Sequence, residues 1–427
     1  MTVQRIRPSQ AVGRVPAPPS KSYTHRALLA AYLAEGTCEV HRPLDSDDTH
    51  ATRDGIRMLG ARVRTKGRVW RVTPPAHPSR IVRGPIRCRE SGTTLRFLSA
   101  AAALGSHRVR FVGAPQLALR PMDDLHQALR GLGVSVQSAA GGRSLPCVIQ
   151  GPLTSGRVTV GGGVSSQFTS ALLMVLPTVS GPSELHIRGA AVSRPYIEAT
   201  LSVVKSRGIR IRRTRRGFLI PGGQTYPAGR IEVPGDASSA AYLWAAAALT
   251  GGRVDVGGIP AGLPQADLAI LSILERMGAR VLRLPRFIRV AGPISAPVNV
   301  DLTDSPDLFP LVSVLAAFVP RRSSRLRGAP HLAFKESDRR SGSVRIAREL
   351  GARVTATRTS VEIVGPSSPR PLNLADLDDH RLVMSAAIAA LGASGPSRVG
   401  RLEAVSKSFP GFWDALGALT QGEGLGS

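Results

Sequence analysis

The chain has 427 residues, 42% of them hydrophobic, which is enough for two or three folded domains and excludes a disordered tail. Its formal net charge of +27 would favour a nucleic-acid partner if aromatic residues were interleaved with the cations, but only 4% of the residues are aromatic. The longest uncharged apolar stretch, residues 237–249, is shorter than the roughly 18 residues that cross a bilayer. We therefore expect a soluble, cytoplasmic protein that binds neither nucleic acid nor membrane.

Cysteine and lysine are both scarce. The three cysteines, Cys38, Cys88 and Cys147, are too widely spaced for a disulfide framework or a cysteine-based metal site, so we expect buried thiols and no metal. Lysine supplies 5 of the 56 basic residues and arginine the rest. A lysine kept in such a chain can mark a site that needs a compact ammonium group. This favours Lys21, Lys335 and Lys407, which lie in polar motifs.

In chain order, the first clear element is a helix that begins near Ser20 and ends before Gly36. A serine before an apolar run is an N-cap signal, because its hydroxyl can accept from a first-turn amide that has no partner within the helix. Such a helix start attracts anions, and Lys21 and Arg26 add positive charge to it. Taken alone, the pattern fits an ordinary capped surface helix equally well.

The same pattern returns at intervals of about 70 residues, which indicates six copies of one strand and helix unit. Each helix-like segment ends in a glycine and is followed at once by a strand-like segment. The later helix starts are at residues 91–96, 165–167, 236–239, 305–307 and 379–381, and the glycines are Gly60, Gly133, Gly208, Gly278, Gly351 and, less clearly, Gly417.

Two proline-rich segments indicate where the chain passes between domains. A short strand in residues 2–15 is followed by Pro16, Pro18 and Pro19, which cannot continue it, and residues 221–229 divide the six units three and three. We predict an α/β fold of two similar domains, residues 1–15 plus 230–427 and residues 16–229.

Several polar segments have both an ordinary and a functional interpretation. Residues 45–49 could form an acidic metal cluster, but a capped helix start is the better interpretation. Residues 335–339 could be a solvated loop. If the helix starts of each domain converge on one cleft, however, they gather many cations there, and a highly anionic ligand is expected. The cations are Lys21, Arg26, Arg96, Arg120, Lys335, Arg339, Arg381 and Lys407.

Ten motifs in register resemble the 5-enolpyruvylshikimate-3-phosphate synthase family over nearly the whole chain. They are residues 20–22 with Arg26, 44–48, 91–93 with Arg96, 120–121, 165–167, 193–196, 235–239, 335–339, 379–381 and 407–410. The resemblance implies two domains of three βαβαββ repeats each, with helix N-termini converging on the interdomain cleft. It also implies transfer of the enolpyruvyl group of phosphoenolpyruvate to the 5-hydroxyl of shikimate 3-phosphate, without metal or organic cofactor.

The resemblance assigns binding residues by their match to the family's motifs. For shikimate 3-phosphate it implies Lys21, Ser22, Arg26, Ser165, Ser166, Gln167, Ser193, Tyr196, Asp307 and Lys335. For phosphoenolpyruvate it implies Lys21, Gly92, Arg120, Gln167, Arg339, His380, Arg381 and Lys407. The chemistry needs an acid and a base close together. We expect Asp307 to act as the base and Glu336 as the proton donor, with Lys21 and Lys407 as further acid candidates.

Some residues depart from the family's pattern. Glu90 places an acid beside the expected phosphoenolpyruvate pocket, which leaves sensitivity to the inhibitor glyphosate open, and His25 and His331 stand where asparagine is common. The sister UDP-N-acetylglucosamine enolpyruvyl transferase is an alternative, but its typical cysteine near the position of Arg120 is absent. An RNA-binding protein on a related repeat fold is a second alternative, which leaves residues 335–339 unexplained. We expect a monomer.

Overall fold

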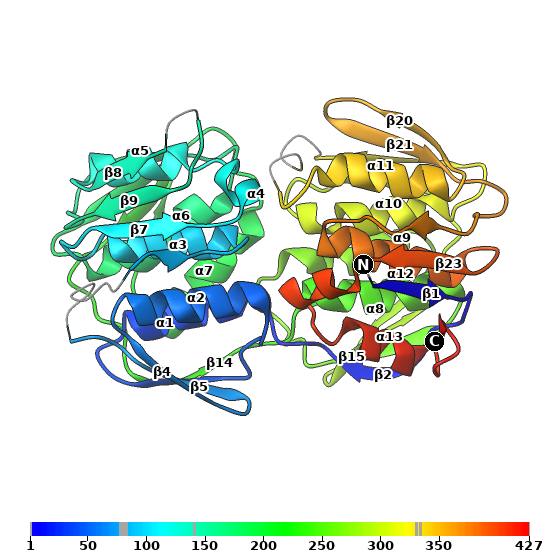
Figure 1. Cartoon of the computed structure of the whole chain (residues 1–427), viewed down its shortest axis with the longest axis horizontal. Helices are drawn as coiled ribbons and strands as arrows, with labels where there is room; N and C mark the ends of the chain where they lie inside the picture. Colours follow the sequence, from blue (N-terminus) through cyan, green and yellow to red (C-terminus); the bar gives the residue numbers. More distant parts are fainter. Residues whose placement is uncertain (1, 77–83, 140–141, 329–331, 333–334, 427) are drawn as a thin grey trace. The chain divides into compact units, whose positions relative to one another are not determined.

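The computed structural model describes residues 2–76, 84–139, 142–328, 332 and 335–426, so His331 lies outside the described residues. The chain divides into two compact units (Figure 1). We call Pro19–Pro234 the insert unit, and Met1–Pro18 with Gly235–Ser427 the terminal unit. These boundaries fall a few residues after the expected ones, because Pro16 still pairs within a strand and the Ala17 amide still donates to the Gly257 carbonyl.

The insert unit contains three four-stranded sheets around its helices. The sheets are ordered β14-β3-β5-β4, β6-β7-β9-β8 and β10-β11-β13-β12. The strands are β3 (Cys38–His41), β4 (Arg62–Lys66), β5 (Val69–Thr73), β6 (Ile86–Arg87), β7 (Val109–Val112), β8 (Ser135–Ser138), β9 (Cys147–Gln150), β10 (Arg157–Gly161), β11 (Ser183–Arg188), β12 (Arg212–Thr214), β13 (Gly217–Ile220) and β14 (Gly229–Glu232). The helices are α1 (Lys21–Tyr32), α2 (Asp47–Met58), α3 (Gly92–Ala102), α4 (Pro115–Ala118), α5 (Asp123–Gly131), α6 (Ser166–Val175), η1 (Leu176–Thr178) and α7 (Arg194–Ser206).

The terminal unit repeats this plan with sheets ordered β16-β17-β15-β2, β18-β19-β21-β20 and β22-β23-β1-β24. Its strands are β1 (Val3–Ile6), β2 (Val12–Pro16), β15 (Arg253–Gly257), β16 (Arg280–Arg283), β17 (Phe287–Ala291), β18 (Asn299–Asp301), β19 (Ser323–Arg327), β20 (Arg353–Ala356), β21 (Ser360–Val364), β22 (Asn373–Leu374), β23 (Ser397–Gly400) and β24 (Leu425–Gly426). Its helices are α8 (Ala237–Thr250), η2 (Ala266–Leu268), α9 (Ala269–Arg276), η3 (Pro306–Leu308), α10 (Phe309–Ala317), α11 (Arg339–Glu349), α12 (His380–Gly392), η5 (Leu402–Lys407) and α13 (Phe412–Leu419).

Every sheet has the same pairing, which confirms the α/β repeat. A parallel pair of strands is extended by two antiparallel strands, as where β10 pairs parallel with β11 and β11 pairs antiparallel with β13. In chain order the second, third and fifth repeats therefore read β-α-β-α-β-β. The sixth repeat takes β1, from the start of the chain, between β23 and β24. The first and fourth repeats differ in their first strand, because β2 pairs with β15 whereas β14 pairs with β3. The two units have exchanged these strands.

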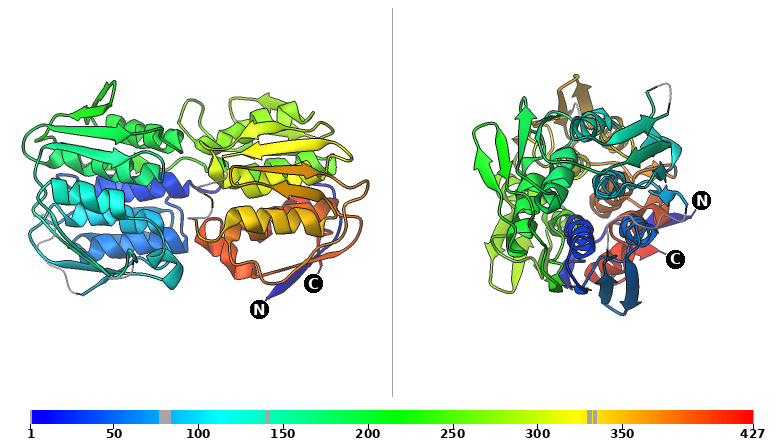
Figure 2. Two further views of the ribbon diagram at one scale, coloured as in Figure 1. Left: turned by 90° about the horizontal axis from the view of Figure 1, so that it is seen from above. Right: turned by 90° about the vertical axis from the view of Figure 1, so that its left-hand side faces the viewer.

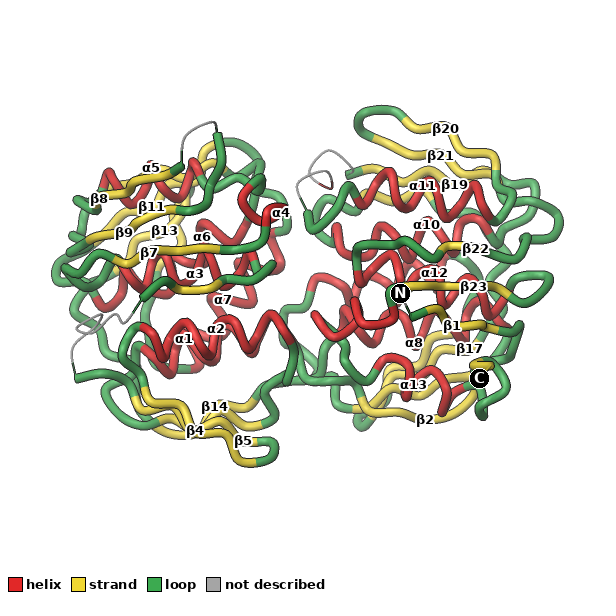
Figure 3. The backbone as a smooth tube through the Cα atoms, viewed as in Figure 1, coloured by secondary structure: helices red, strands yellow, loops and turns green. Residues whose placement is uncertain are grey.

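One helix of each repeat is buried among the sheets, which lie outside the helices (Figure 3). In the right-hand view of Figure 2 the helices of the insert unit are seen end-on, with strands around them. The buried helices are α1, α3 and α6 in one unit and α8, α10 and α12 in the other. Beyond their first two turns their sequences are apolar or small on nearly all sides, as expected for helices without a solvent face.

Small residues let the helices approach closely. A Cβ at Gly55 of α2 would lie 2.2 Å from a methyl carbon of Leu98 on α3, so a larger residue at that position does not fit without a shift.

Cys38, Cys88 and Cys147 are buried and free, which confirms the expectation that these thiols are buried. Within the described residues, every helix is too short or too polar to span a bilayer.

Candidate active site

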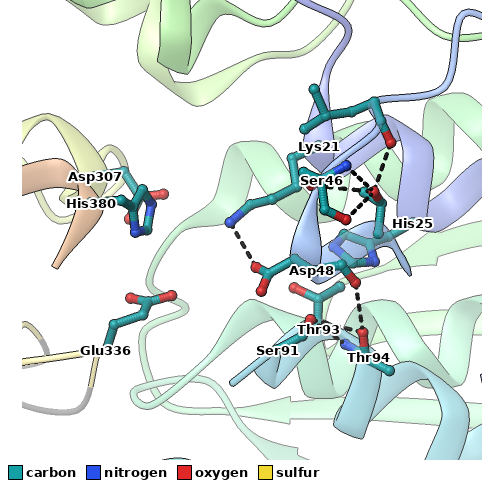
Figure 4. A network of polar contacts seen from close by, with 12 residues as sticks. Lys21, His25, Ser46, Asp48, Ser91, Thr93, Thr94, Asp307, Glu336 and His380 are labelled. Carbon is teal, nitrogen blue, oxygen red and sulfur yellow. Dashed lines mark hydrogen bonds and ion pairs between the residues drawn. The ribbon is translucent and has the colours of Figure 1, made fainter. Parts of the chain in front are cut away.

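The first turns of the insert unit's helices are joined by polar contacts. The Lys21 ammonium, in the first turn of α1, lies 2.9 Å from the Asp48 carboxylate in the first turn of α2 (Figure 4). The Asp48 carbonyl accepts from the Thr94 hydroxyl of α3, which also donates to Ser91 at 2.8 Å. The N-termini of α1, α2 and α3 therefore meet at one end of the unit.

Helix capping explains why several of these starts are polar. The hydroxyls of Ser91 and Ser165 accept from the Thr94 and Gln167 amides, as the sequence predicted. Ser20 is the N-cap residue of α1, but its hydroxyl accepts from no first-turn amide, so the predicted cap at this position is wrong. A backbone bond holds this turn instead, because the Ser20 carbonyl accepts from the Thr24 amide.

Arg26 is buried and joins α1 to α7. Its Nε donates to the Thr200 hydroxyl, and its two terminal nitrogens donate to the carbonyls of Ser22 and Tyr196, all at 2.8 Å. Burial lowers the pKa of Arg26 to about 10, which leaves it protonated at neutral pH. Arg26 thereby fixes the backbone of Ser22 and Tyr196, two of the residues expected to bind shikimate 3-phosphate.

Arg96 joins α3 to α6 as Arg26 joins α1 to α7. It donates to the Gln167 side-chain oxygen at 2.6 Å and to the Pro121 carbonyl at 3.0 Å. The Gln167 amide nitrogen donates in turn to the Thr93 hydroxyl at 2.9 Å, so both ends of this side chain are held. Asn and Gln amides held at both ends have one defined orientation.

Gly92 and Arg120 lie in direct contact. A Cβ at Gly92 would be 2.8 Å from the guanidinium carbon of Arg120, so only glycine leaves room for this side chain where it lies. Ser166, in the first turn of α6, is buried. Ser193, the N-cap residue of α7, has a left-handed backbone with φ of 54°, which is strained for a residue other than glycine and often marks a functional position.

A buried guanidinium organises the terminal unit. Arg339 is 1% exposed and binds three carboxylates, those of Asp307 at 2.7 Å, Glu336 at 2.6 Å and Asp379 at 2.7 Å. Burial opposes the charged form of Arg339, but these carboxylates raise its pKa above its ordinary value. Asp379 also caps α12, because its other oxygen accepts from the Arg381 amide at 2.8 Å.

Asp307 is surrounded by cations. Besides Arg339, the Arg381 guanidinium lies 2.8 Å from its carboxylate and the Lys335 ammonium 3.5 Å. Burial acts to raise the pKa of Asp307, but Arg381, Lys335 and Arg339 hold it well below its ordinary value. Asp307 is therefore a carboxylate with three cations directed at it.

His380 and Lys407 complete the predicted set. His380 is buried in the first turn of α12, with Nδ1 3.5 Å from an oxygen of Asp379. Lys407 is buried at the end of η5. The Trp413 indole donates to the Leu402 carbonyl, which ties α13 to the start of η5. Aromatic packing of Phe409, Phe412 and Trp413 rigidifies the segment that follows Lys407.

Contacts thus join some of the predicted residues within each unit, such as Arg26 with Tyr196 or Asp307 with Arg381, whereas for Ser166, Ser193 and Lys407 the structure gives burial at a helix end. Three carboxylates were not predicted as site residues, namely Asp48, Asp267 and Asp379. Asp48 and Asp379 lie at helix starts, where capping explains an acid, and their cations Lys21 and Arg339 are distant in the sequence. Asp267 carries no motif at all. Among the described residues, no group of three or more His, Cys, Asp or Glu is arranged to hold a metal ion.

Comparisons with known proteins agree with this geometry. The sequence model of the EPSP synthase (3-phosphoshikimate 1-carboxyvinyltransferase) family matches residues 6–416. A 3-phosphoshikimate 1-carboxyvinyltransferase of Thermococcus kodakarensis is 43% identical over 97% of this chain and 100% of its own, and one of Methanocorpusculum labreanum is 38% identical over 95% of each. In fold, the chain resembles an EPSP synthase structure from Acinetobacter baumannii, with a TM-score of 0.81, 24% identity and 98% of each chain covered. The family match and these relatives show that the chain belongs to the EPSP synthase (3-phosphoshikimate 1-carboxyvinyltransferase) family.

Proposed function

We infer that the two clusters of helix starts bind the two anionic substrates of this family's reaction. The chain transfers the enolpyruvyl group of phosphoenolpyruvate to the 5-hydroxyl of shikimate 3-phosphate and releases phosphate. The convergence of polar first turns within each unit carries the assignment of residues to substrates, because it places cations, hydroxyls and free amides together.

For shikimate 3-phosphate we propose hydroxyl, amide and cation donors of the insert unit, and Asp307 with Lys335 of the terminal unit. The hydroxyls of Ser165 and Ser166 stand at the start of α6, where the positive end of the helix dipole favours a phosphate group. Arg26 contributes through the positions of its neighbours. The proposed ligands are Lys21, Ser22, Arg26, Ser165, Ser166, Gln167, Ser193, Tyr196, Asp307 and Lys335.

For phosphoenolpyruvate we propose mainly guanidinium and ammonium groups. Arg120 lies against Gly92 in the insert unit, and Arg339 and Arg381 flank Asp307 in the terminal unit. Planar guanidinium groups suit the carboxylate and phosphate of this substrate, since they donate in pairs. The full proposed set is Lys21, Gly92, Arg120, Gln167, Arg339, His380, Arg381 and Lys407.

The acid and base are proposed from the carboxylates around Arg339. Phosphoenolpyruvate gains a proton at its methylene carbon while the 5-hydroxyl loses one and adds to the adjacent carbon. The resulting ketal phosphate then loses a proton from its new methyl group as phosphate leaves, which re-forms the carbon–carbon double bond. We propose Asp307 as the base, although its low pKa makes it a weak one while three cations face it. An anionic substrate bound to those cations would raise that pKa.

Glu336 is the proposed proton donor, with Lys21 and Lys407 as further acids. The Arg339 ion pair stabilises the charged form of Glu336, so a proton can be held there only once this contact weakens. A substrate anion that draws Arg339 away would have that effect. Binding of phosphoenolpyruvate and protonation of Glu336 are therefore coupled in this mechanism.

We also propose a cytoplasmic monomer. Among the described residues, the large exposed hydrophobic side chains are Leu119 and Leu284, which do not form the extended apolar patch of a stable homodimer. Free cysteines are compatible with a reducing compartment.

The decisive experiment measures phosphate release from phosphoenolpyruvate with and without shikimate 3-phosphate. We expect release only when both are present, with formation of the enolpyruvyl ether confirmed by mass spectrometry. Release that instead requires UDP-N-acetylglucosamine would contradict the proposal. The oligomeric state is tested separately by sedimentation equilibrium, in which a mass near 45.0 kDa is expected.

A further inference from the structure

The terminal unit buries a carboxyl group, Asp267, that has no part in the proposed reaction. Asp267 lies in η2 and is 1% exposed. One of its oxygens, Oδ2, accepts from the Ser238 hydroxyl in the first turn of α8. Its other oxygen, Oδ1, is buried and has no hydrogen-bond partner among the described residues. An ionised carboxylate with a bare oxygen is costly in such a place, so the neutral acid is favoured.

The segment that carries Asp267 is fixed to the start of α8. The Gln265 side chain accepts from the Ala237 amide at 2.8 Å and donates to the Gly235 carbonyl at 2.9 Å. These bonds and that of Ser238 place the Asp267 carboxyl among the helix starts of the terminal unit. Because α8 also packs against η3 and α12, which carry Asp307 and Arg381, the carboxyl is held near the proposed substrate cations.

Charged groups face Asp267 from each element around it. Asp307 of η3 and Asp236 at the start of α8 disfavour its charged form, whereas Arg381 of α12 and the Ser238 hydroxyl favour it. The helix that follows, α9, carries no charged residue before Glu275, in its last turn. Burial has the largest effect and Asp307 the next largest, and together they raise the pKa of Asp267 to about 6.

We propose that Asp267 is a positioning residue that holds a proton behind Asp307 and so preserves the positive charge that Arg381 and its neighbours present to an anionic substrate. The proton exchanges with solvent and is not transferred to substrate. When Asp267 ionises, a second carboxylate opposes the cations around Asp307, and anionic substrates bind less tightly. The inference rests on the proposed roles of Asp307 and Arg381.

The test compares wild type with Asp267→Asn. Asparagine has the shape of the neutral acid and can still accept from Ser238, but it cannot ionise. KM for each substrate is measured from pH 5 to pH 8 in both proteins. The ratio of the wild-type KM to the variant KM is then taken at each pH, because this ratio cancels the effect of ionisation of the substrates themselves. The ratio should rise about three- to ten-fold between pH 5 and pH 7.5 for the substrate that Arg381 binds, as expected for one added charge at this range.

Two further variants fix the origin of that rise. Ser238→Ala removes the hydrogen bond that stabilises the ionised form, so the rise should move to higher pH. Asp255→Asn is the matched control, because Asp255 is also a buried aspartate of the terminal unit but pairs with Arg14 and Arg289 in an outer sheet. For Asp255→Asn, the ratio of the wild-type KM to the variant KM should not change with pH.

A measurement without turnover separates this inference from the proposed function. In infrared difference spectra between pH 5 and pH 8, wild type should lose a carboxylic acid band that Asp267→Asn lacks. The inference is overturned if no such band exists, or if Asp267→Asn changes KM by the same factor at every pH, which is the result of a merely structural role. If instead neither wild type nor any variant converts the two substrates, the proposed function fails. The infrared measurement still tests the protonation of Asp267 in that case.

Discussion

Arg26 and Arg96 show how a cation near a helix start can fix the elements around it. Each lies in the first two turns of a buried helix, donates to backbone carbonyls of a neighbouring helix start, and packs over an aromatic ring of the next repeat. Arg26 lies 5.4 Å from the ring centre of Phe97, and Arg96 lies 5.2 Å from that of Phe168. The sequence indicated cations at these positions. It could not show that Arg26 donates to Tyr196 and Thr200 or that Arg96 donates to Gln167, because those acceptors lie on another repeat.

Gly92 offers a sharp test of the proposed phosphoenolpyruvate ligands. In Gly92→Ala the new methyl group would lie 2.8 Å from the guanidinium carbon of Arg120 and push that side chain aside. We expect KM for phosphoenolpyruvate to rise roughly ten-fold or more, about 1.4 kcal/mol, with a smaller change for shikimate 3-phosphate. Steady-state kinetics with each substrate varied in turn measure this.

The matched control for that change is Gly131→Ala. Gly131 ends the helix α5, and a Cβ there meets no atom within 4 Å. This variant should keep both KM values. Equal losses for both substrates in Gly92→Ala would argue that the substitution disturbs the fold and not Arg120 alone.

Glu336→Gln tests the proposed proton donor. Glutamine can keep a hydrogen bond to Arg339 but has no acidic proton, so turnover should fall by about 100-fold or more while the Kd for shikimate 3-phosphate changes little. Titration calorimetry measures the affinity, and phosphate release measures turnover. Glu349→Gln, an exposed change on α11, is the control. Unaltered turnover in Glu336→Gln would remove this residue from the mechanism.

At the scale of the helices, a buried chain of hydrogen bonds joins α1, α2 and α3. His25 Nδ1 lies 2.7 Å from the Thr52 hydroxyl, which lies 2.7 Å from that of Thr94, and Thr94 in turn contacts Asp48. Burial lowers the pKa of His25 to about 3, against its ordinary value of 6.5, so the ring is neutral in the folded protein. His25 Nε2 is also buried without a partner among the described residues.

This histidine should make the insert unit sensitive to acid. Above pH 6.5 it is neutral in both the folded and unfolded chain, and its neutral contacts are fully present. Between pH 6.5 and pH 3 only the unfolded chain takes up the proton, so stability falls with pH, by a few kcal/mol at most. In His25→Asn this loss is absent. The Tm of the variant should therefore rise steadily relative to that of wild type as the pH falls from 7 to 4.

Thermal unfolding monitored by circular dichroism measures that difference. Exposed His107 supplies the control, since His107→Asn makes the same exchange outside the buried network. A constant offset for His25→Asn across the range would mean that the ring is protonated in the folded protein after all.

The helices were largely predictable because their signals are local. Five consecutive residues or fewer decide whether Ser91, Ser165 or Asp379 can cap, and the glycine that ends a helix is adjacent to it. The polar clusters between helices were not predictable in the same way. The contact of Asp48 with Lys21, or of Asp379 with Arg339, depends on which helices become neighbours, and no local pattern records that.

At the scale of the whole molecule, strand exchange defines what each unit needs in order to fold. β14 lies at the end of the insert unit and completes the sheet of β3, β4 and β5. The sequence predicted three repeats in each domain, but pairing between strands so far apart could not be foreseen from periodicity. Residues 19–234 nevertheless contain all three sheets and the whole core of this unit.

We therefore expect a fragment of residues 19–234 to fold alone. A fragment that ends at Pro227 lacks β14 and exposes the edge of β3, so its Tm should be lower by several degrees or it should aggregate. Both are compared by circular dichroism and limited proteolysis. If the two fragments were equally stable, β14 would contribute little to the sheet.

The pairing of β1 has a consequence for how the protein is made. β1 leaves the ribosome long before its partners β23 and β24, which lie at Ser397–Gly400 and Leu425–Gly426. At about 5 to 20 residues per second, this strand waits on the order of 20 to 80 seconds, while the insert unit can be completed behind it. Arg5 and Arg7 give the waiting segment a charge that discourages pairing with other nascent chains. The sheet that contains β1 thus closes only after β23 and β24 have been made.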